Sequence, residues 1–413
     1  MNRRVVITGV GLITPLGIGT DESWSAVCSG KSGIGPITKF DTSDFNTRIA
    51  GEVKNFDPAD FLPKKEANRT EPHISYSVAA SLMAMEDSAL KIDSSNSERI
   101  GVLIGCAMGG LASLERNIEL IQKKGPRRVS PFFIPMMITN MAAGQISIHV
   151  GAKGPNASVA TACAAGTHAI GEAYNFIQKG YADAMIAGGV ESVITPTSIA
   201  GFNALKALSL RNDEPQKASR PFDRDRDGFV LGEGCGIVIL ESLDHALERG
   251  APIYAEISGF GMSGDAYHIT APVPNGDGAA RCMQAALDDG NLQPESIDYI
   301  NAHGTGTPMN DVCETLAIKT VFKNNAALIP VSSTKSMTGH LIGGAGGVET
   351  VFTALTIKHG IIPPTINLDN PAEGCDLDYV PNIARKKDVT CAMTNSFGFG
   401  GTNASLILKK FLS

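Results

Sequence analysis

The stretch ATACAAG, from Ala160 to Gly166, places a single cysteine at the junction of two predicted elements. Just before it, Ser158–Thr161 has the small and β-branched residues expected at the end of a buried strand. From Cys163 to about Lys179, apolar residues recur at helical spacing, at Ile170, Ala173, Phe176 and Ile177. We therefore expect Cys163 at or near a helix N-terminus, where unpaired backbone N–H groups and the helix dipole favour a thiolate. A buried structural thiol, the usual role of a free cysteine, is the alternative for this stretch taken alone.

The bulk composition is that of an ordinary soluble protein. At 413 residues the chain is too long for one simple core, so two domains or one large two-lobed domain are expected. A net charge of −7 argues against general binding to nucleic acid. Its eight cysteines include no C-x-x-C pair, which favours reduced thiols over a disulfide framework or a zinc site, and we expect neither a metal nor a cofactor. The sequence has no secretory leader and no apolar run of membrane-spanning length, so a cytoplasmic protein without a membrane partner is expected.

Short apolar or β-branched runs alternate with helical patterns along the chain, which indicates an α/β fold. The predicted strands have little polar alternation and suit burial on both faces; they are Arg4–Thr8, Arg99–Ile104, Ser158–Thr161, Ala184–Ala187 and Cys235–Glu241. A helix ends in Gly and Pro near 249–252, so we expect an N-terminal half at 1–250 and a C-terminal half at 251–413.

A faint internal repeat supports two related halves. Cys163 is followed after four residues by His168-Ala169-Ile170-Gly171, and Lys335 after four residues by His340-Leu341-Ile342-Gly343. This alignment predicts that Cys163 and Lys335 lie at equivalent helix starts.

Two further segments contain histidines in unusual settings. Asp298–Pro308 reads as a short strand that delivers His303 to a loop of glycine and threonine, where backbone can approach a ligand closely. Ser332–His340 is polar and then enters an apolar, glycine-rich helix with Glu349 on it. Either histidine alone is more often a structural residue. Two such loops together with a helix-starting cysteine predict a Cys/His/His active site.

The segment Asn395–Asn403 combines three glycines with two phenylalanines near the C-terminus. Such a turn exposes backbone N–H groups, which an oxyanion hole requires. A plain glycine turn before the last predicted strand, Ser405–Leu408, is the alternative for this segment alone.

Together these motifs resemble those of the β-ketoacyl-[acyl-carrier-protein] synthases. The resemblance rests on Thr161–Gly166, His303–Pro308, Lys335–His340 and Asn395–Asn403, with the connecting segments Ser219–Asp223, Gly232–Gly234 and Pro363–Leu368. It extends from Arg3 to Lys410, and Lys335–Met337 and Asp376–Pro381 are more like the type II, elongating synthases. The resemblance implies a thiolase-like five-layered αβαβα fold from two similar halves, the first bearing the cysteine and the second the two histidines, usually in a homodimer.

The reaction implied is the decarboxylative Claisen condensation of fatty acid chain elongation. An acyl group carried as a thioester on Cys163 would condense with malonyl-acyl carrier protein to give β-ketoacyl-acyl carrier protein. The ring N–H groups of His303 and His340 would stabilise the enolate, and the backbone N–H groups of Cys163 and Phe399 the tetrahedral oxyanion. Lys335 would place a positive charge near His340.

The resemblance also implies residues that bind the substrates. Thr305 and Thr307 would bind the pantetheine arm, and Phe399 would also gate the acyl pocket. Met108, Phe202 and Phe133 would line that pocket, with Met108 flexible enough to admit longer chains. The acidic carrier protein would dock on basic residues, which are Lys65, Arg69, Arg127, Arg128 and Lys206, with Lys64 and Arg211 nearby. Asn68 stands where the family often has a basic residue.

Three other functions share parts of this pattern. A ketosynthase of an iterative polyketide pathway has the same motifs, although the type II-like features favour fatty acid elongation. A biosynthetic thiolase would need a second cysteine in a Cys-Gly-Gly-Gly segment, which is absent near Asn403. A catalytically inactive partner subunit that determines chain length would lack the nucleophile, whereas Cys163 is present. The sequence leaves open whether a monovalent cation lies near Glu349.

Overall fold

The computed structural model describes residues 3–67 and 69–412, so Asn68 lies outside the described residues. Its central feature is a long sheet with strand order β11-β10-β14-β15-β9-β1-β8-β7-β5-β6 and β2 paired to β1. The N-terminal half supplies β1 (Val5–Thr14), β5 (Ile100–Gly105), β6 (Asn156–Val159), β7 (Ala184–Glu191) and β8 (Gly234–Ser242). The C-terminal half supplies β9 (Ala255–Gly264), β10 (Tyr299–Asn301), β11 (Val331–Ser332), β14 (Cys391–Gly398) and β15 (Thr402–Lys409). Antiparallel pairing of Val5–Ile7 in β1 with Ala255–Ile257 in β9 joins the two sets.

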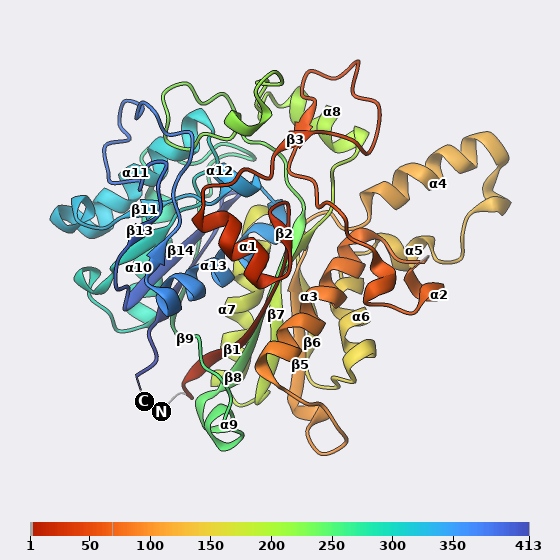
Figure 1. Cartoon of the computed structure of the whole chain (residues 1–413), viewed down its shortest axis with the longest axis horizontal. Helices are drawn as coiled ribbons and strands as arrows, with labels where there is room; N and C mark the ends of the chain where they lie inside the picture. Colours follow the sequence, from red (N-terminus) through yellow and green to blue (C-terminus); the bar gives the residue numbers. More distant parts are fainter. Residues whose placement is uncertain (1–2, 68, 413) are drawn as a thin grey trace.

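Helices cover both outer faces and fill the space between the two sets of strands (Figure 1). Helices α3 (Pro72–Ser88) and α6 (Met141–Val150) pack on the outer face of the first set, and α10 (Asp277–Asp289) with α11 (Pro308–Phe322) on that of the second. Helices α7 (Ala165–Gln178) and α13 (Ala345–His359) lie between them and contact each other. These are the five αβαβα layers expected from the resemblance.

The sequence explains why the middle layers are buried. Every residue of β7 and β8 is buried, as their continuous apolar runs predict for strands covered on both faces. Helix α13 is buried from Ala345 to Ile357, which requires a helix that is mostly apolar all round. Close approach between α7 and α13 depends on small residues, since a Cβ atom at Gly166 would lie 2.7 Å from the backbone nitrogen of Gly347.

The internal repeat is real, but the alignment of Cys163 with Lys335 is wrong. Cys163 lies in the 3₁₀ turn η4 (Ala162–Ala164), which leads directly into α7. The matching turn in the second half is η8 (Ile342–Gly344), which leads into α13, so the counterpart of Cys163 is Gly343. Lys335 instead begins α12 (Lys335–Thr338), an extra helical turn between β11 and η8 that has no equivalent in the first half. This insertion shifts the two histidine motifs out of register.

The remaining elements are short or peripheral, and α4 with α5 extends away from the layered body (Figure 1). They comprise β2 (Gly17–Ile18), α1 (Thr20–Cys28), β3 (Gly35–Pro36), β4 (Ile49–Ala50), η1 (Pro58–Asp60), α2 (Lys64–Ala67), η2 (Ser97–Arg99), α4 (Leu111–Lys124), η3 (Pro126–Arg128), α5 (Phe133–Met137), α8 (Pro196–Ala204), η5 (Pro215–Lys217), α9 (Leu243–Glu248), η6 (Pro294–Ser296), η7 (Lys323–Ala327), β12 (Ile361–Ile362) and β13 (Arg385–Lys386). Among the helices formed by residues 3–67 and 69–412, none is both long and apolar enough to cross a membrane.

Candidate active site

The three predicted reactive side chains meet at one cavity of about 750 Å³. Cys163 comes from the N-terminal half, and His303 and His340 from the C-terminal half. The cavity is also lined by six other residues predicted from the sequence, which are Met108, Phe202, Lys206, Thr305, Thr307 and Phe399. Phe133, the first residue of α5, is not among the lining residues of this single chain. The cavity therefore brings the motifs of both halves together.

The thiol of Cys163 differs from the sequence expectation in its protonation. Burial raises the pKa of Cys163 to about 11, while the backbone N–H groups of Phe399 and Cys163 and the charge of Lys335 act to lower that pKa. Its side chain is only 6% exposed, so loss of hydration outweighs the start of the helix. The resting residue is a protonated thiol, with the N–H groups of Cys163 and Phe399 close to its sulfur.

The imidazoles of His303 and His340 are buried and face one another edge to face. Their ring centroids are 5.3 Å apart and their planes meet at 85°. Burial and the charge of Lys335 hold the pKa of both rings well below the ordinary value for histidine. Each ring is therefore neutral near pH 7 and offers one N–H donor. Within the described residues, the Nδ1 atom of each ring has no hydrogen-bond partner.

Lys335 lies behind the two histidines and is not part of the cavity lining. Its ammonium forms a buried ion pair with Glu349, and both side chains are almost fully inaccessible. Burial raises the pKa of Glu349 to about 7, and Lys335 acts to lower that pKa. Lys335 influences the pKa of Cys163, His303 and His340, so its role here is electrostatic. In residues 3–67 and 69–412, no three His, Cys, Asp or Glu side chains gather as a metal-binding group.

The loop after His303 is held by two buried carboxylates of α11. Glu314 accepts hydrogen bonds from the backbone N–H groups of His303 and Gly304, both at 2.8 Å. Asp311 accepts one from Gly306 at 3.2 Å and another from Phe222 at 2.7 Å. Burial raises the pKa of Glu314 to about 7. These carboxylates accept hydrogen bonds from backbone N–H groups of the loop, which have no partner within a helix or strand.

Arg226 clamps the same loop from the N-terminal half. Its guanidinium donates to the carbonyls of Thr307 at 3.0 Å and Pro308 at 2.7 Å. It also lies 3.5 Å from Asp311, and its side chain is only 7% exposed. The hydroxyls of Thr305 and Thr307, which are 3.0 Å apart, consequently lie along the cavity wall.

Sequence reasoning missed Arg226, Asp311 and Glu314. The sequence did contain a signal for the two carboxylates. Asp311 and Glu314 are three residues apart, so they share one face of a helix, and this helix directly follows the His303 motif. Nothing local marks Arg226, which is far from the loop in sequence. Its contacts emerge only when the two halves pack together.

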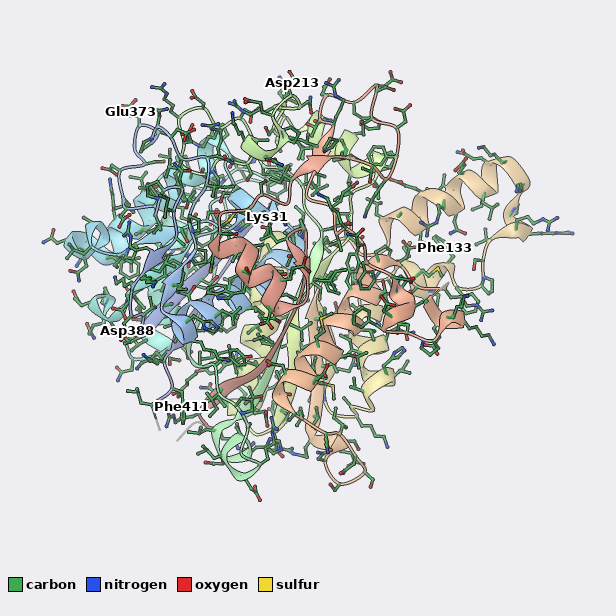
Figure 2. The ribbon with its side chains drawn as sticks, in the orientation of Figure 1. Lys31, Phe133, Asp213, Glu373, Asp388 and Phe411 are labelled. Atoms are coloured by element: carbon green, nitrogen blue, oxygen red, sulfur yellow. The ribbon has the colours of Figure 1, made fainter. Side chains whose placement is uncertain are left out.

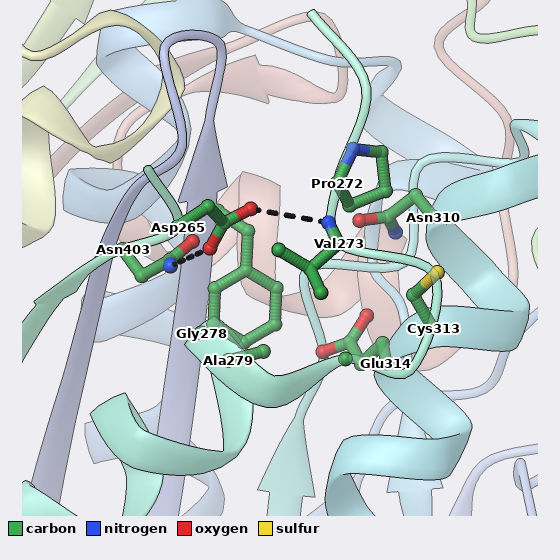
Figure 3. A pocket seen from close by; sticks show the side chains of 11 residues that line it. Asp265, Pro272, Val273, Gly278, Ala279, Asn310, Cys313, Glu314 and Asn403 are labelled. Atoms are coloured by element: carbon green, nitrogen blue, oxygen red, sulfur yellow. Dashed lines mark hydrogen bonds between the residues drawn. The ribbon is translucent and has the colours of Figure 1, made fainter. Parts of the chain in front are cut away.

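A second loop covers the turn near the C-terminus. Asp265 accepts hydrogen bonds from the side-chain amide of Asn403 at 2.7 Å and the backbone of Val273 at 3.4 Å (Figure 3). Its own N–H donates to the carbonyl of Gly401 at 2.8 Å. Gly401 has a φ of +69°, a left-handed conformation that glycine adopts without strain. Beneath these contacts is a small space of about 20 Å³ that Glu314 also lines (Figure 3). This loop was not predicted as part of the site.

The predicted docking residues come from several separate elements. Lys64 and Lys65 begin α2, while Arg127 and Arg128 belong to η3, which lies between α4 and α5 in the chain; Figure 2 labels Phe133, the first residue of α5. The guanidinium of Arg69 lies 4.7 Å from the centre of the Phe132 ring. Two further residues lie elsewhere, Lys206 in the cavity lining and Arg211 paired with Glu214.

Comparisons with known proteins agree with this geometry. Residues 2–246 match the family model for the N-terminal domain of β-ketoacyl synthases, and residues 254–369 that for the C-terminal domain. The chain is 56% identical over 409 residues to 3-oxoacyl-[acyl-carrier-protein] synthase 2 of Synechocystis sp., covering 99% of this chain and 98% of that protein. It is 53% identical over 408 residues to the protein of the same name from Coxiella burnetii, covering 99% of each.

Solved structures give the same assignment. The ishigamide ketosynthase/chain length factor superposes with a TM-score of 0.92 at 37% identity over the whole of both chains. A type II PKS acyl-carrier protein in complex with its ketosynthase, bound to the hexaketide, gives a TM-score of 0.92 at 36% identity, again over the whole of both chains. With matched domains in both halves and relatives above half identity over its full length, this chain belongs to the β-ketoacyl synthase family.

Proposed function

We propose that this protein is the condensing enzyme of fatty acid chain elongation, joining malonyl-acyl carrier protein to an acyl group held on Cys163. The observation that carries the proposal is the convergence of Cys163, His303 and His340 on one cavity. Relatives that share 52–56% of its residues are named 3-oxoacyl-[acyl-carrier-protein] synthase 2. The type II PKS ketosynthase is less similar, at 36% identity, which favours fatty acid elongation.

The first step is transfer of the acyl group to the enzyme. The sulfur of Cys163 attacks the thioester carbonyl, and the oxygen takes up negative charge near the backbone N–H groups of Cys163 and Phe399. The carbon–sulfur bond to the carrier arm then breaks. Because burial keeps Cys163 protonated at rest, its proton must leave during the attack, and the departing pantetheine thiol takes it up.

The second step is decarboxylation of the malonyl thioester. The neutral rings of His303 and His340 donate N–H groups to the thioester oxygen, on which charge develops as the bond to carbon dioxide breaks. The enolate carbon then attacks the acyl carbonyl on Cys163, and the carbon–sulfur bond to the enzyme breaks. The sulfur leaves as a thiolate and recovers one proton from solvent, which balances the reaction.

The other residues position substrates or adjust charge. Together with burial, the charge of Lys335 keeps the histidines neutral, and it acts to lower the pKa of Cys163. Thr305 and Thr307 bind the pantetheine arm, and Phe399 gates the acyl end that Met108 and Phe202 line. The carrier protein, an acidic partner, docks beside Lys206 and on the basic residues of α2 and η3.

We place the working protein in the cytoplasm as a homodimer. All eight cysteines are free thiols, as in a reducing compartment.

Strand β6 ends the sheet without a further neighbour among the described residues, and the nearby extended segment exposes apolar side chains such as Ile118 at 47% and Ile134 at 54%. Such a face is typical of a protein interface, and Phe133 belongs to it. Sedimentation of Ile134→Asp beside the parent protein tests this, and an unchanged monomeric mass for both would reject it.

The decisive experiment is intact mass spectrometry of the protein mixed with a long-chain acyl carrier protein. We expect one acyl adduct that Cys163→Ala cannot form. Addition of malonyl carrier protein should discharge the adduct as a β-keto product two carbons longer. Absence of an adduct with any acyl chain would reject the proposal. A His303→Ala, His340→Ala double variant that still decarboxylates malonyl carrier protein would reject the roles of the histidines.

A further inference from the structure

Glu191, the last residue of β7, is a fully buried carboxylate that accepts four backbone hydrogen bonds. One oxygen accepts from Ala107 at 2.9 Å and Gly343 at 3.2 Å. The other accepts from Met108 and Gly109, both at 3.2 Å. The donors belong to two segments, the loop after β5 and the turn η8 before α13. Glu191 therefore joins the two halves at a single side chain.

The geometry fits the ionised form of Glu191. Burial raises the pKa of this carboxyl group, and the four N–H donors act to lower it. Each oxygen receives two N–H donors, and the thiol of Cys106 also donates to Oε1 at 3.5 Å, so every group around the carboxyl is a donor and matches an ionised acceptor. Several N–H donors to one buried carboxyl group favour its charged form and oppose the effect of burial.

The backbone that Glu191 holds lines the cavity, at the part that the proposed function assigns to the acyl chain. Ala107, Met108 and Ile342 all line the cavity beside Cys163. Ala107, Ile342 and Cys163 also belong to one apolar cluster together with Phe202. The segment 106–110 lies in neither a helix nor a strand. It is anchored at its two ends by Cys106, which bonds to Val159, and Gly110, which bonds to Met137.

We infer that Glu191 is a positioning residue that sets the acyl-end wall and thereby limits which acyl chains Cys163 accepts. The inference rests on the proposed function, because it concerns the acyl donor of that reaction. While the carboxylate accepts these hydrogen bonds, the backbone of Ala107 to Gly109 cannot move away from the cavity. Without it, three adjacent N–H groups lose their acceptor and the wall moves outward. Long chains then enter more readily, while short chains that do not reach the wall are unaffected.

Glu191 also acts on the nucleophile through its charge. Burial is the main cause of the raised pKa of Cys163, and the carboxylate of Glu191 adds to it, whereas the N–H of Phe399 and the charge of Lys335 act to lower that pKa. The neighbouring rings of His303 and His340 are neutral. Replacing Glu191 by glutamine removes the negative charge at nearly constant shape, so the thiol should ionise at a lower pH.

Glu191→Gln tests both effects. The initial rates of Cys163 acylation are compared for butyryl, octanoyl and hexadecanoyl carrier proteins by intact mass. We expect the ratio of hexadecanoyl to butyryl rates to rise roughly tenfold, the scale of discrimination produced by a small misfit in an apolar pocket. The pH profile of Cys163 alkylation should move to lower pH. Unchanged ratios in the folded variant would overturn the inference.

Two further variants keep the test decisive. Glu191→Asp retains the charge but is one methylene too short to reach both segments, so it should change the chain-length ratio and leave the alkylation profile in place. If either substitution prevents folding, Met108→Ala, at a position 36% exposed, should still raise the long-chain ratio, and no change would overturn the inference. Glu52→Gln is the matched control, since Glu52 is buried, accepts N–H groups of Thr38 and Lys39, and is not among the cavity-lining residues.

Failure of this inference is distinct from failure of the proposed function. If no acyl carrier protein acylates the parent protein, the condensing activity itself is rejected. If the parent protein is acylated and the variants keep its chain-length ratio, only the role of Glu191 is rejected.

Discussion

Ala162 and Ile342 have the same left-handed backbone conformation, with φ of 48° and 47°, and each begins the 3₁₀ turn that leads into a central helix. This conformation is strained for alanine and more so for a β-branched isoleucine. Its retention in both halves shows that the two turns are structural equivalents. One turn presents Cys163 to the cavity, and the other lines the cavity with Ile342, while Gly343 occupies the position equivalent to Cys163.

Gly343→Ala should destabilise the protein and slow acylation of Cys163. A Cβ atom there would lie 2.7 Å from the backbone nitrogen of Ala107 and 2.8 Å from the carboxylate of Glu191. Overpacking of this kind costs about 1–3 kcal/mol. The thermal midpoint and the acylation rate should both fall. Gly144→Ala, whose Cβ would meet only the sulfur of Met141 at 3.8 Å, is the control and should not lower the midpoint.

The rate of Cys163 alkylation by iodoacetamide should continue to rise at pH values where the rate for an ordinary thiol has become constant. Burial raises the pKa of Cys163 to about 11, so the reactive thiolate fraction keeps growing where a free thiol, with a pKa of about 8.5, has levelled off. The rate is followed by mass spectrometry, with Cys163→Ser identifying the modified site. Lys335→Met removes a positive charge that acts to lower this pKa, so the pH profile of alkylation in this variant should move to higher pH. A plateau below pH 9 in the parent protein would contradict the assignment.

Removing one partner of the buried pair between Lys335 and Glu349 should cost more stability than removing both. Lys335→Met leaves Glu349 buried without a counter-charge, a change that typically costs about 3–5 kcal/mol. In the double variant Lys335→Met, Glu349→Gln no charge remains unpaired, so part of the loss should be recovered. Denaturant unfolding of the parent, both single variants and the double variant measures this coupling. Additive losses would show that the pair is not coupled.

His73 should make the fold sensitive to mild acid. Burial lowers the pKa of His73 to about 4, so the unfolded chain binds a proton more readily than the folded one as pH falls below the ordinary value of about 6.5. Stability is therefore lost on acidification, by about 2 kcal/mol from this group between pH 7 and pH 5. His73→Leu should remove that part of the pH dependence. Unfolding free energies at the two pH values test this, and equal differences in both proteins would contradict it.

Arg226→Lys should weaken binding of the carrier-protein thioesters more than it slows the chemistry. Lysine keeps the charge but cannot hold the carbonyls of Thr307 and Pro308 together with Asp311. We expect KM to rise roughly tenfold, the loss of about one charge-assisted hydrogen bond, with kcat changed less. Arg224→Lys, at a side chain 63% exposed, is the matched control and should behave as the parent protein. A matching fall in kcat with constant KM would reject this role.

The sequence predicted the fold class, the turn of Cys163 and the loop of His303 from local patterns, whereas Met108, Phe202, Lys206, Thr305, Thr307 and Phe399 were expected at the site from the family resemblance. Continuous apolar runs identified β7 and β8, and the change from strand to helix located Cys163 at its turn. The glycine-rich loops identified His303 and the segment around Phe399. Each of these predictions needs only the spacing of neighbouring residues.

The sequence could not predict effects that arise from packing between distant segments. The raised pKa of Cys163 comes from burial by both halves, which outweighs the helix start visible in the sequence. Arg226 and Glu191 act on backbone far away in the chain. One feature of the sequence did point to Glu191, which is an acidic residue at the end of a buried and otherwise uncharged strand. A buried acidic side chain requires hydrogen-bond or ionic partners. The misaligned repeat had a local cause, the extra turn α12.

The sheet topology also constrains how the chain can fold as it is synthesised. Strand β1 is made first, and only its end pairs locally, with the two residues of β2. Its long-range partners are β8, where Val5 pairs with Ser242, and β9, where Val5 pairs with Ile257. On the ribosome most of this buried apolar strand therefore stays unpaired until nearly all of the first half has been made. Helix α3 is made early and packs on β1 in the finished fold, so early contact with α3 would shield this strand from aggregation during synthesis.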